Sequence, residues 1–475
     1  MGSANRAGWI EAAVVTALSG ALNWFGNGLN PVWQLMWFAV LPVLWFSMRS
    51  SRWMAAAVAM ASMLIGGLSM WHYLHGVLGA PVSVWVTVYA LQAVAMALAV
   101  LLFRALVLRG RVWSALVAVP ALWVACEYAR NLTTPHGSAG SLAYTQLHFL
   151  QFLQLASVTG PWGMTFVLLL FQSAVVIASY LWTTERQRAL RVAGVGSGVA
   201  LAVIVFGAVR LAAPEGKTVR VGLIASDVTE GVADPGASSA KLYEAYAGQV
   251  ERLAQQGARE IVMPEMLGVI LQPETGPMDG FLQTAADRTG ATIVAGAVVV
   301  DKPLKYNEAR VYLPQAPVSR YDKEHLLPPF ESSTEPGHSL TLLPQQGHVV
   351  GIAICKDMDF ARPARSYGEA GAGVLLVPAW DFVVDNAWHG HIAVMRGVED
   401  GFSMVRSAKG GFLTVSDWRG RILAEARSDS ARFATLIADV PAEHHATLYQ
   451  RVGDWFAWVS VGLLSFVIVR AAMPR

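Results

Sequence analysis

Three residues with complementary chemistry each end or follow a short run in the second half of the chain. Glu265 follows the run EIVMP, Lys323 lies in the segment YDKEHLLPPFE, and Cys355 closes the run VVGIAIC. A carboxylate can take the proton of a thiol, and an ammonium lowers a thiol pKa and stabilises an oxyanion. The three residues together predict a site in which the cysteine attacks a carbonyl carbon.

The segments around these residues predict an α/β layered domain. Buried strands are expected at 219–224, 260–263, 291–300, 349–354 and 373–377. Apolar residues at helical spacing occur at 239–257 and again at 386–406, where Trp388, Ile392, Met395 and Val398 share one face. Strands that alternate with helices are typical of layered α/β folds.

The amino-terminal part of the chain has the composition of a membrane protein. Hydrophobic residues make up 54% of the chain and charged residues 14%, mean hydropathy is +0.43, and no lysine precedes Lys217. A membrane-spanning helix needs about 20 apolar residues. About eight spans are expected, near 8–27, 31–48, 53–75, 82–107, 112–130, 160–182, 192–212 and 454–471. The more polar stretch 131–159 predicts a long loop or a re-entrant piece.

Arginines in the short loops predict the orientation of the spans. They gather before the first span, in every second loop and after the last span, with Arg130 as the exception; they are Arg6, Arg49, Arg52, Arg104, Arg109, Arg111, Arg186, Arg188, Arg191, Arg470 and Arg475. Both termini are therefore expected in the cytoplasm of a bacterial-type cell. The expected parts are a seven-helix transmembrane domain at 1–214, a periplasmic or extracytoplasmic catalytic domain at 215–447, and a final transmembrane helix at 448–475.

Charge and cysteine content argue against other classes of protein. The net charge is +2 and no basic stripe with interleaved aromatic residues occurs, so no nucleic-acid partner is expected. Cys126 lies in an apolar run and Cys355 in a strand-like run, which does not fit a disulfide framework. His389 and His391 are too few for a metal site. No phosphate loop or dinucleotide fingerprint is present, and no cofactor is expected.

The segments that carry the chemistry resemble the nitrilase superfamily of carbon–nitrogen hydrolases. The matching pieces are Pro264-Glu265, Tyr306-Asn307, Tyr321-Asp322-Lys323 and Ile354-Cys355. The resemblance implies an αββα sandwich in which Glu265 is the base, Lys323 stabilises the oxyanion and Cys355 is the nucleophile. It also implies that Glu331 helps to hold the site.

Further supporting residues are predicted at Asn307, Lys356, Asp357 and His389. Lys356 brings a second positive charge next to the thiol, where it either lowers the thiol pKa or points away into solvent. Lys356 and Asp357 stand where the acyltransferase branch of this superfamily usually has an aromatic residue and a glutamate. His389 is expected to be structural or to form part of the wall of the site.

The chain as a whole resembles the apolipoprotein N-acyltransferase family, the membrane-embedded branch of this superfamily. The matching features are a nitrilase-type domain between the seventh and eighth spans and the segments 120–130, 154–166 and 389–399. The resemblance implies a phospholipid acyl donor, a thioester on Cys355, and the N-terminal amine of a diacylglyceryl-cysteine lipoprotein as acceptor. A monomer embedded in the inner membrane is expected.

Two other interpretations stay open at this point. A membrane-bound amidase of the nitrilase type would use the same three residues but pass the acyl group to water, and the unusual Cys-Lys-Asp stretch favours it. A lipid-binding or scaffold protein with an inactive domain would not need the thiol at all. A Cys355→Ser variant with unchanged function would support the scaffold.

Overall fold

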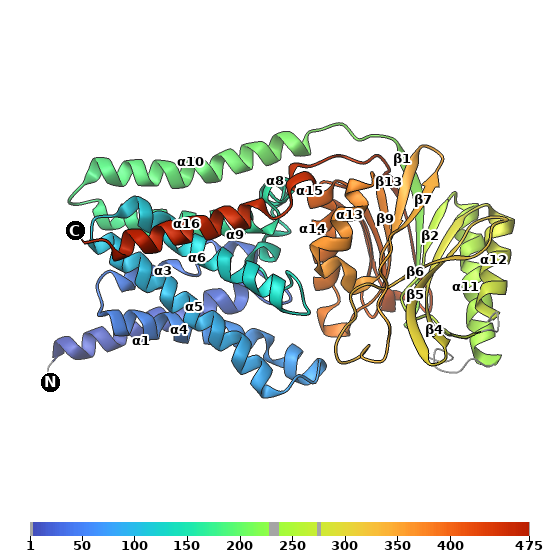
Figure 1. Ribbon diagram of the computed structural model, residues 1–475, viewed down its shortest axis with the longest axis horizontal. Coiled ribbons are helices and arrows are strands. Elements are labelled where there is room, and N and C mark those ends of the chain that lie inside the picture. Colours follow the sequence, from blue (N-terminus) through green and yellow to red (C-terminus); the bar gives the residue numbers. More distant parts are fainter. Residues whose placement is uncertain (1–2, 228–236, 273–276, 475) are drawn as a thin grey trace. The chain divides into compact units, whose positions relative to one another are not determined.

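The computed structural model describes residues 3–227, 237–272 and 277–474, and the chain divides into two compact units (Figure 1). The first unit comprises Met1–Thr133, Gly140–Ala212 and Val452–Arg475. The second comprises Thr134–Ala139 and Ala213–Arg451. A piece of six residues from the apolar half of the sequence therefore belongs to the second unit.

The first unit is a bundle of long apolar helices (Figure 1). Among the described residues, six helical segments are long and apolar enough to cross a membrane. They are α4 (Arg52–Gly67) with the short turn η1 (Leu68–Met70), α5 (Val82–Leu108), α6 (Val112–Thr133), α9 (Pro161–Leu181), α10 (Arg186–Leu211) and α16 (Trp455–Ala472). A helix satisfies all of its backbone polar groups internally, which lipid requires. Helix α1 (Ser3–Gly26) packs against α4 but is not among the six.

The predicted span at 31–48 is not one helix. It consists of α2 (Trp33–Met36) and α3 (Leu41–Ser47), with a proline near the start of α3. Gln172 of α9 accepts hydrogen bonds from the N–H groups of Val40 and Leu41, at 2.8 and 3.1 Å, and donates to the carbonyl of Met36 at 3.1 Å. One side chain thus satisfies backbone groups that the break leaves open. The number of spans, expected to be about eight, stays a prediction.

The polar stretch between α6 and α9 folds into short helical pieces rather than a span. They are η3 (Leu142–Gln146), α7 (Leu150–Leu153) and α8 (Ala156–Thr159), and another short piece, η2 (His72–Val77), follows α4. Glu127 of α6 anchors the first of these pieces. Its buried carboxylate accepts four hydrogen bonds of 2.8–3.1 Å, from Trp123 Nε1, Ser141 Oγ, the N–H of Leu142 and Thr165 Oγ1.

The second unit is a four-layer sandwich of helices, two sheets and helices (Figure 1). The first sheet has the order β13–β1–β2–β4–β5–β6, with β3 paired to β4. Its strands are β1 (Thr218–Ala225), β2 (Glu260–Val262), β3 (Val269–Leu271), β4 (Thr292–Asp301), β5 (Leu304–Tyr312), β6 (Ser319–Asp322) and β13 (Ala434–Pro441). Strands β1, β2 and β4 run parallel, so their carboxyl ends share one edge.

The second sheet has the order β12–β11–β10–β9–β8–β7. Its strands are β7 (Thr341–Gln345), β8 (His348–Ile352), β9 (Val374–Trp380), β10 (Ser403–Lys409), β11 (Phe412–Ser416) and β12 (Ile422–Arg427). Strands β8, β9 and β10 run parallel. The short turns η4 (Cys355–Asp359), η5 (Val383–Asp385) and η6 (Ser428–Ser430) and the helix α15 (Leu448–Val452) complete this part of the chain.

Three apolar cores join the four layers, because strand side chains alternate between the two faces of a sheet. Helices α11 (Ala237–Gln255) and α12 (Pro277–Thr289) cover the outer face of the first sheet. Side chains such as Leu223, Val294 and Leu376 fill the space between the sheets. Helices α13 (Ala361–Glu369) and α14 (Trp388–Asp400) cover the second sheet.

The strands predicted from the sequence coincide with β1, β2, β4, β8 and β9, although β8 already ends at Ile352. The helix expected over 386–406 is shorter than predicted. Helix α14 ends at Asp400 because Gly401 follows with φ +75°, and β10 begins at Ser403. A left-handed residue of this kind stops a helix, and glycine adopts it without strain.

Replacing Glu127 with alanine should destabilise the first unit, because four buried donors lose their acceptor. Each unsatisfied donor costs about 1–3 kcal/mol. The thermal midpoint of the detergent-purified protein should fall by about 5 °C or more. Glu11→Ala is the control, since Glu11 forms only an exposed ion pair with Arg49; equal midpoints of the two variants would refute the anchoring role.

Candidate active site

Glu265 is held at the end of β2 by close packing of the backbone. Its N–H donates to the carbonyl of Ala379 in the second sheet at 3.2 Å. A Cβ atom on Gly296 of β4 would come within 2.4 Å of the Cα of Glu265, so only glycine permits this approach. Met266, the next residue, has φ +52°. A non-glycine residue in this region is strained, and such strain gathers at functional sites.

Lys323 follows β6 and lies between two carboxylates. Its Nζ atom donates to Glu265 at 2.8 Å and to Glu331 at 2.7 Å. Asn307 of β5 donates to the same two carboxylates, at 2.7 and 2.6 Å. Glu331 also accepts from the N–H of Leu327 at 2.7 Å. All four charged or amide side chains are buried, so each group is oriented by the others.

Cys355 begins the turn η4 immediately after β8 and has φ +42°. Its thiol donates to the carbonyl of Trp380, at the end of β9, over 3.6 Å. The charges of Glu265 and Lys323 both act on the pKa of this thiol. The structure therefore places the three residues that the sequence singled out after the carboxyl ends of strands from both sheets, with Lys323 hydrogen bonded to Glu265.

Asp357 ties the turn of the nucleophile to the segment that carries the lysine. It accepts four hydrogen bonds of 2.8–3.2 Å, from the hydroxyl of Tyr321 and from the N–H groups of Glu324, His325 and Ile354. These donors flank Lys323 on both sides and precede Cys355 directly. Asp357 is thus placed to set the position of the thiol relative to the ammonium.

The pKa directions describe a resting site with a neutral thiol. Burial, and next the carboxylate of Glu265, raise the pKa of the Cys355 thiol, while Lys323 lowers it less. Burial also raises the pKa of Glu265, against the lowering effect of Lys323. Burial lowers the pKa of Lys323, but the carboxylates of Glu265 and Glu331 outweigh it and leave that pKa above its usual value. The lysine therefore stays charged and the thiol needs a base.

The side chain of Lys356 is buried and contacts Asp359 and His136 rather than solvent. Its side chain is 4% exposed, and its ammonium lies 3.2 Å from Asp359 Oδ2 and 3.3 Å from His136 Nδ1. The solvent-facing alternative is therefore wrong. Asp359 neutralises this charge. Burial alone would raise the pKa of the Asp359 carboxyl, but His389 and Lys356 hold that pKa below the usual range.

His389 lies between two buried carboxylates, and its structural role stays a prediction. It lies 3.1 Å from Asp359 Oδ1 and 3.4 Å from Asp385 Oδ2. Burial alone would lower its pKa, but the two carboxylates raise the pKa to about 10. No group of three or more His, Cys, Asp and Glu that would hold a metal occurs within residues 3–227, 237–272 and 277–474.

Sequence reasoning missed two parts of the surroundings. Arg406 forms a double hydrogen bond with Asp381, and both charges act on the pKa of the Cys355 thiol. The other part is the segment 134–139, whose Ser138 donates to the carbonyl of Asp359 through its N–H and its hydroxyl, each at 3.1 Å. This segment lies in the polar stretch after α6, and that polarity was the one feature of the sequence that set it apart from the spans.

The comparisons with known proteins match both units. Residues 19–174 match the family model described as apolipoprotein N-acyltransferase N-terminal domain, and residues 233–448 match the carbon–nitrogen hydrolase model. An apolipoprotein N-acyltransferase of Geobacter metallireducens is 26% identical, over 94% of this chain and 92% of its own length. The chain belongs to the apolipoprotein N-acyltransferase family.

A second relative agrees with this membership. An apolipoprotein N-acyltransferase of Treponema denticola is 23% identical over 74% of this chain and 77% of its own length. Among solved structures, an amidase from Nesterenkonia sp. covers 49% of this chain and 94% of its own, with 21% identity and a TM-score of 0.41. As a member of this family the chain is an enzyme of the carbon–nitrogen hydrolase type, and the six long apolar helices among the described residues fit a membrane protein.

Asp357→Asn should destabilise the second unit, because the amide would turn an NH₂ group toward N–H and O–H donors. Losing charged hydrogen bonds and leaving a donor unpaired costs about 3 kcal/mol. The thermal midpoint of the intact protein should fall by about 5–10 °C.

The matched control for this variant is Asp439→Asn. Asp439 pairs with Arg220 on the exposed surface, where an ion pair contributes about 0–1 kcal/mol. If the Asp357 variant melts at the same temperature as the control, Asp357 does not hold the two segments together.

Proposed function

We propose that this enzyme moves a fatty acyl chain from a phospholipid, through a thioester on Cys355, to the N-terminal amine of diacylglyceryl-cysteine lipoproteins. One observation carries the proposal. Lys323 is hydrogen bonded to Glu265, both charges act on the Cys355 thiol, and the described part of the chain also holds six helices long and apolar enough to cross a membrane. The names of its relatives supply the substrate class. Substrates that live in a bilayer give a reason for a membrane anchor.

The first half-reaction follows from the three side chains. Glu265 takes the proton of the Cys355 thiol as the sulfur attacks the ester carbonyl of the phospholipid. Negative charge develops on the carbonyl oxygen, where the ammonium of Lys323 stabilises it. The carbon–oxygen bond then breaks, and the leaving alkoxide takes the proton from Glu265. The products are a lyso-phospholipid and an acyl thioester on Cys355.

The second half-reaction uses the same residues in the same order. The free amine of the lipoprotein attacks the thioester carbonyl and passes a proton to Glu265. The oxyanion again forms beside Lys323. When the carbon–sulfur bond breaks, the thiolate regains the proton from Glu265, and an amide remains on the lipoprotein. No proton or electron is left over, so no cofactor is needed.

The electrostatics support this division of roles. A base must have a pKa high enough to receive a thiol proton, and burial raises the pKa of Glu265 in that direction. Lys323 cannot serve as the base because its pKa lies above the usual value. Asn307 donates to both glutamates and Glu331 accepts from the lysine, so these two residues hold the base and the ammonium in place.

We also propose that the catalytic domain faces the periplasm or another extracytoplasmic space, with both termini in the cytoplasm of an inner-membrane protein. The distribution of arginines between alternate loops supports this orientation. The proposed parts remain a transmembrane domain at 1–214, the catalytic domain at 215–447 and a final helix at 448–475.

Intact mass spectrometry of the purified protein incubated with phospholipid tests the thioester. The expected result is a mass gain of one fatty-acyl group that hydroxylamine removes and that a Cys355→Ala variant never shows. A diacylglyceryl-cysteine peptide should then discharge the adduct onto its amine. Release of free fatty acid without transfer, or release of ammonia from an amide, would instead support the amidase.

Glu265→Gln should slow formation of the thioester by about 10²–10⁴-fold, the usual effect of removing a general base. In the wild type the rate should rise with pH through a pKa above the ordinary glutamate value of 4.5, because only the carboxylate accepts the proton. Lys323 keeps its charge over this range, so no early alkaline loss is expected.

The pH profile is measured by quenched-flow acylation with a fluorescent phospholipid. Glu335→Gln is the control. Glu335 follows Glu331 closely in the sequence, but its side chain is exposed to solvent. An unchanged rate in the Glu265 variant would rule out the proposed base.

A further inference from the structure

Two hollows lie on the first unit beside the turn that joins α9 to α10. One, of about 470 Å³, is lined by Trp113, Glu185, Arg186, Gln187, Arg188 and Arg191. The other, of about 450 Å³, is lined by Val175, Ala178, Ser179, Trp182 and Ala193. None of these residues belongs to the candidate active site. One hollow is strongly charged and the other is apolar.

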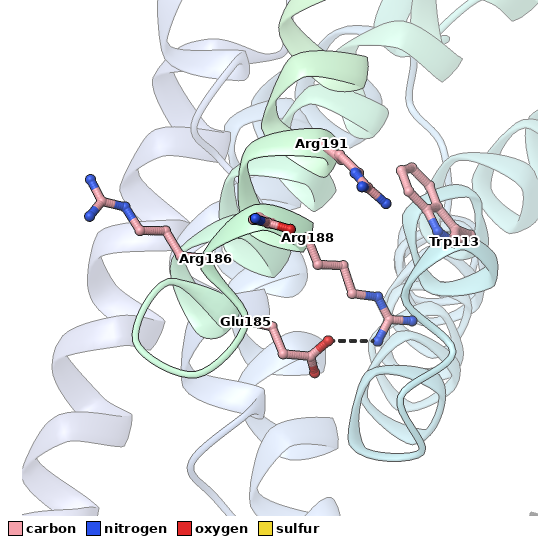
Figure 2. A pocket seen from close by; sticks show the side chains of 6 residues that line it. Trp113, Glu185, Arg186, Arg188 and Arg191 are labelled. Carbon is pink, nitrogen blue, oxygen red and sulfur yellow. Dashed lines mark hydrogen bonds and ion pairs between the residues drawn. The ribbon is translucent and has the colours of Figure 1, made fainter.

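Positive charge dominates the first hollow (Figure 2). Arg188 and Arg191 extend toward Trp113, while Arg186 extends on the opposite side of the helix start. Glu185 is the one carboxylate among the lining residues, and it pairs with Arg188 at 3.0 Å. Arg188 also donates to the carbonyl of Gly110 at 2.8 Å. Within residues 3–227, 237–272 and 277–474, no carboxylate forms an ion pair with Arg186 or Arg191, so both charges are available to an anion.

The second hollow is an apolar groove along the seam between α9 and α10. The two helices approach closely because Gly196 has no side chain; a Cβ there would lie 2.4 Å from Cβ of Ala174. The small side chains of Ala178 and Ala193 leave the groove open beside this contact. From Trp182 to Val175 the groove extends about 10 Å along the helix, at about 1.5 Å per residue.

The charged end and the apolar groove meet at one pair of residues. The guanidinium of Arg186 lies over the ring of Trp182, 5.1 Å from its centre, and Trp182 also lines the groove. Tryptophan and arginine are the side chains that lie at the level of lipid headgroups. A guanidinium binds phosphate oxygens in pairs, and an apolar seam suits an acyl chain.

We propose that the α9–α10 turn binds an anionic phospholipid, with its phosphate on Arg186 and one acyl chain in the groove beside Ala178 and Ala193. Arg188 and Arg191 supply positive charge that favours an anionic headgroup over a zwitterionic one. The apolar groove favours a lipid over free phosphate, because only a lipid has an acyl chain that fills it. This lipid lies in the leaflet that the arginine-rich loops face, and it is a bound ligand of the membrane unit, not the acyl donor.

Native mass spectrometry of the full-length protein in detergent tests the site. Dioleoyl-phosphatidylglycerol and dioleoyl-phosphatidylcholine are added in equal amounts, so that only the headgroup charge differs. The wild type should retain phosphatidylglycerol preferentially. Arg186→Gln combined with Arg191→Gln should weaken that retention at least tenfold. Ala193→Phe, which fills the groove and leaves every charge in place, should weaken it as well.

The matched control is Arg49→Gln combined with Arg52→Gln. These arginines also lie over tryptophan rings, at 4.9 Å from Trp45 and from Trp53, but line neither hollow. The control should retain phosphatidylglycerol like the wild type. Equal retention of the two lipids by the wild type, or equal losses in both double variants, would overturn the proposal. Displacement of the lipid by millimolar inorganic phosphate would overturn it too, in favour of a free-anion site.

Discussion

The candidate active site depends on one buried ammonium placed between two carboxylates. Lys323 reaches Glu265 and Glu331 from the end of β6, and Asn307 joins the same two carboxylates from β5. Burying these charges is costly unless each is paired and hydrogen bonded. Because the pairing is satisfied here, removing the lysine would leave two adjacent carboxylates buried and mutually repelling. The geometry of the base thus depends on the group that stabilises the oxyanion.

The nucleophile reaches this cluster from the other sheet, so the contact between the sheets sets its position. Cys355 is strained at φ +42°, and the carbonyl of Trp380 accepts from its thiol. Asp357 then bridges the thiol turn and the segment around Lys323. The αββα sandwich therefore provides two rigid strand ends that face one another, while a single aspartate fixes the loops between them.

Local sequence patterns predicted the parts of the fold and site that depend on neighbours along the chain. Glu265 and Cys355 were recognisable because each follows a short apolar run, and Lys323 because of the segment Tyr321-Asp322-Lys323. The end of α14 was not predicted, although Gly401 marks it locally. Gln172, by contrast, lies on a distant helix and satisfies backbone groups at the break in the span 31–48, and no local pattern reports that.

The remaining misses are long-range pairs of charged residues. Arg406 lies within β10 and Asp381 follows β9, 25 residues earlier, and neither residue shows its partner until the sheet forms. The direction of Lys356 depends on Asp359 and on His136, a residue 220 positions earlier. Only a folded chain reveals such partners, because charge type alone does not say which of many carboxylates is near.

The six-residue segment 134–139 makes the boundary of the catalytic domain discontinuous. His136 contacts Lys356, Ser138 contacts Asp359 and Arg396, and Gly137 lies so close to the carbonyl of Asp359 that a side chain would collide with it. A fragment that comprises residues 213–451 alone would therefore lack the segment 134–139, which contacts the turn of the nucleophile. To produce the catalytic domain on its own, both segments are needed: the long segment 213–451 and the short segment 134–139. They can be supplied as two peptides or joined by a linker.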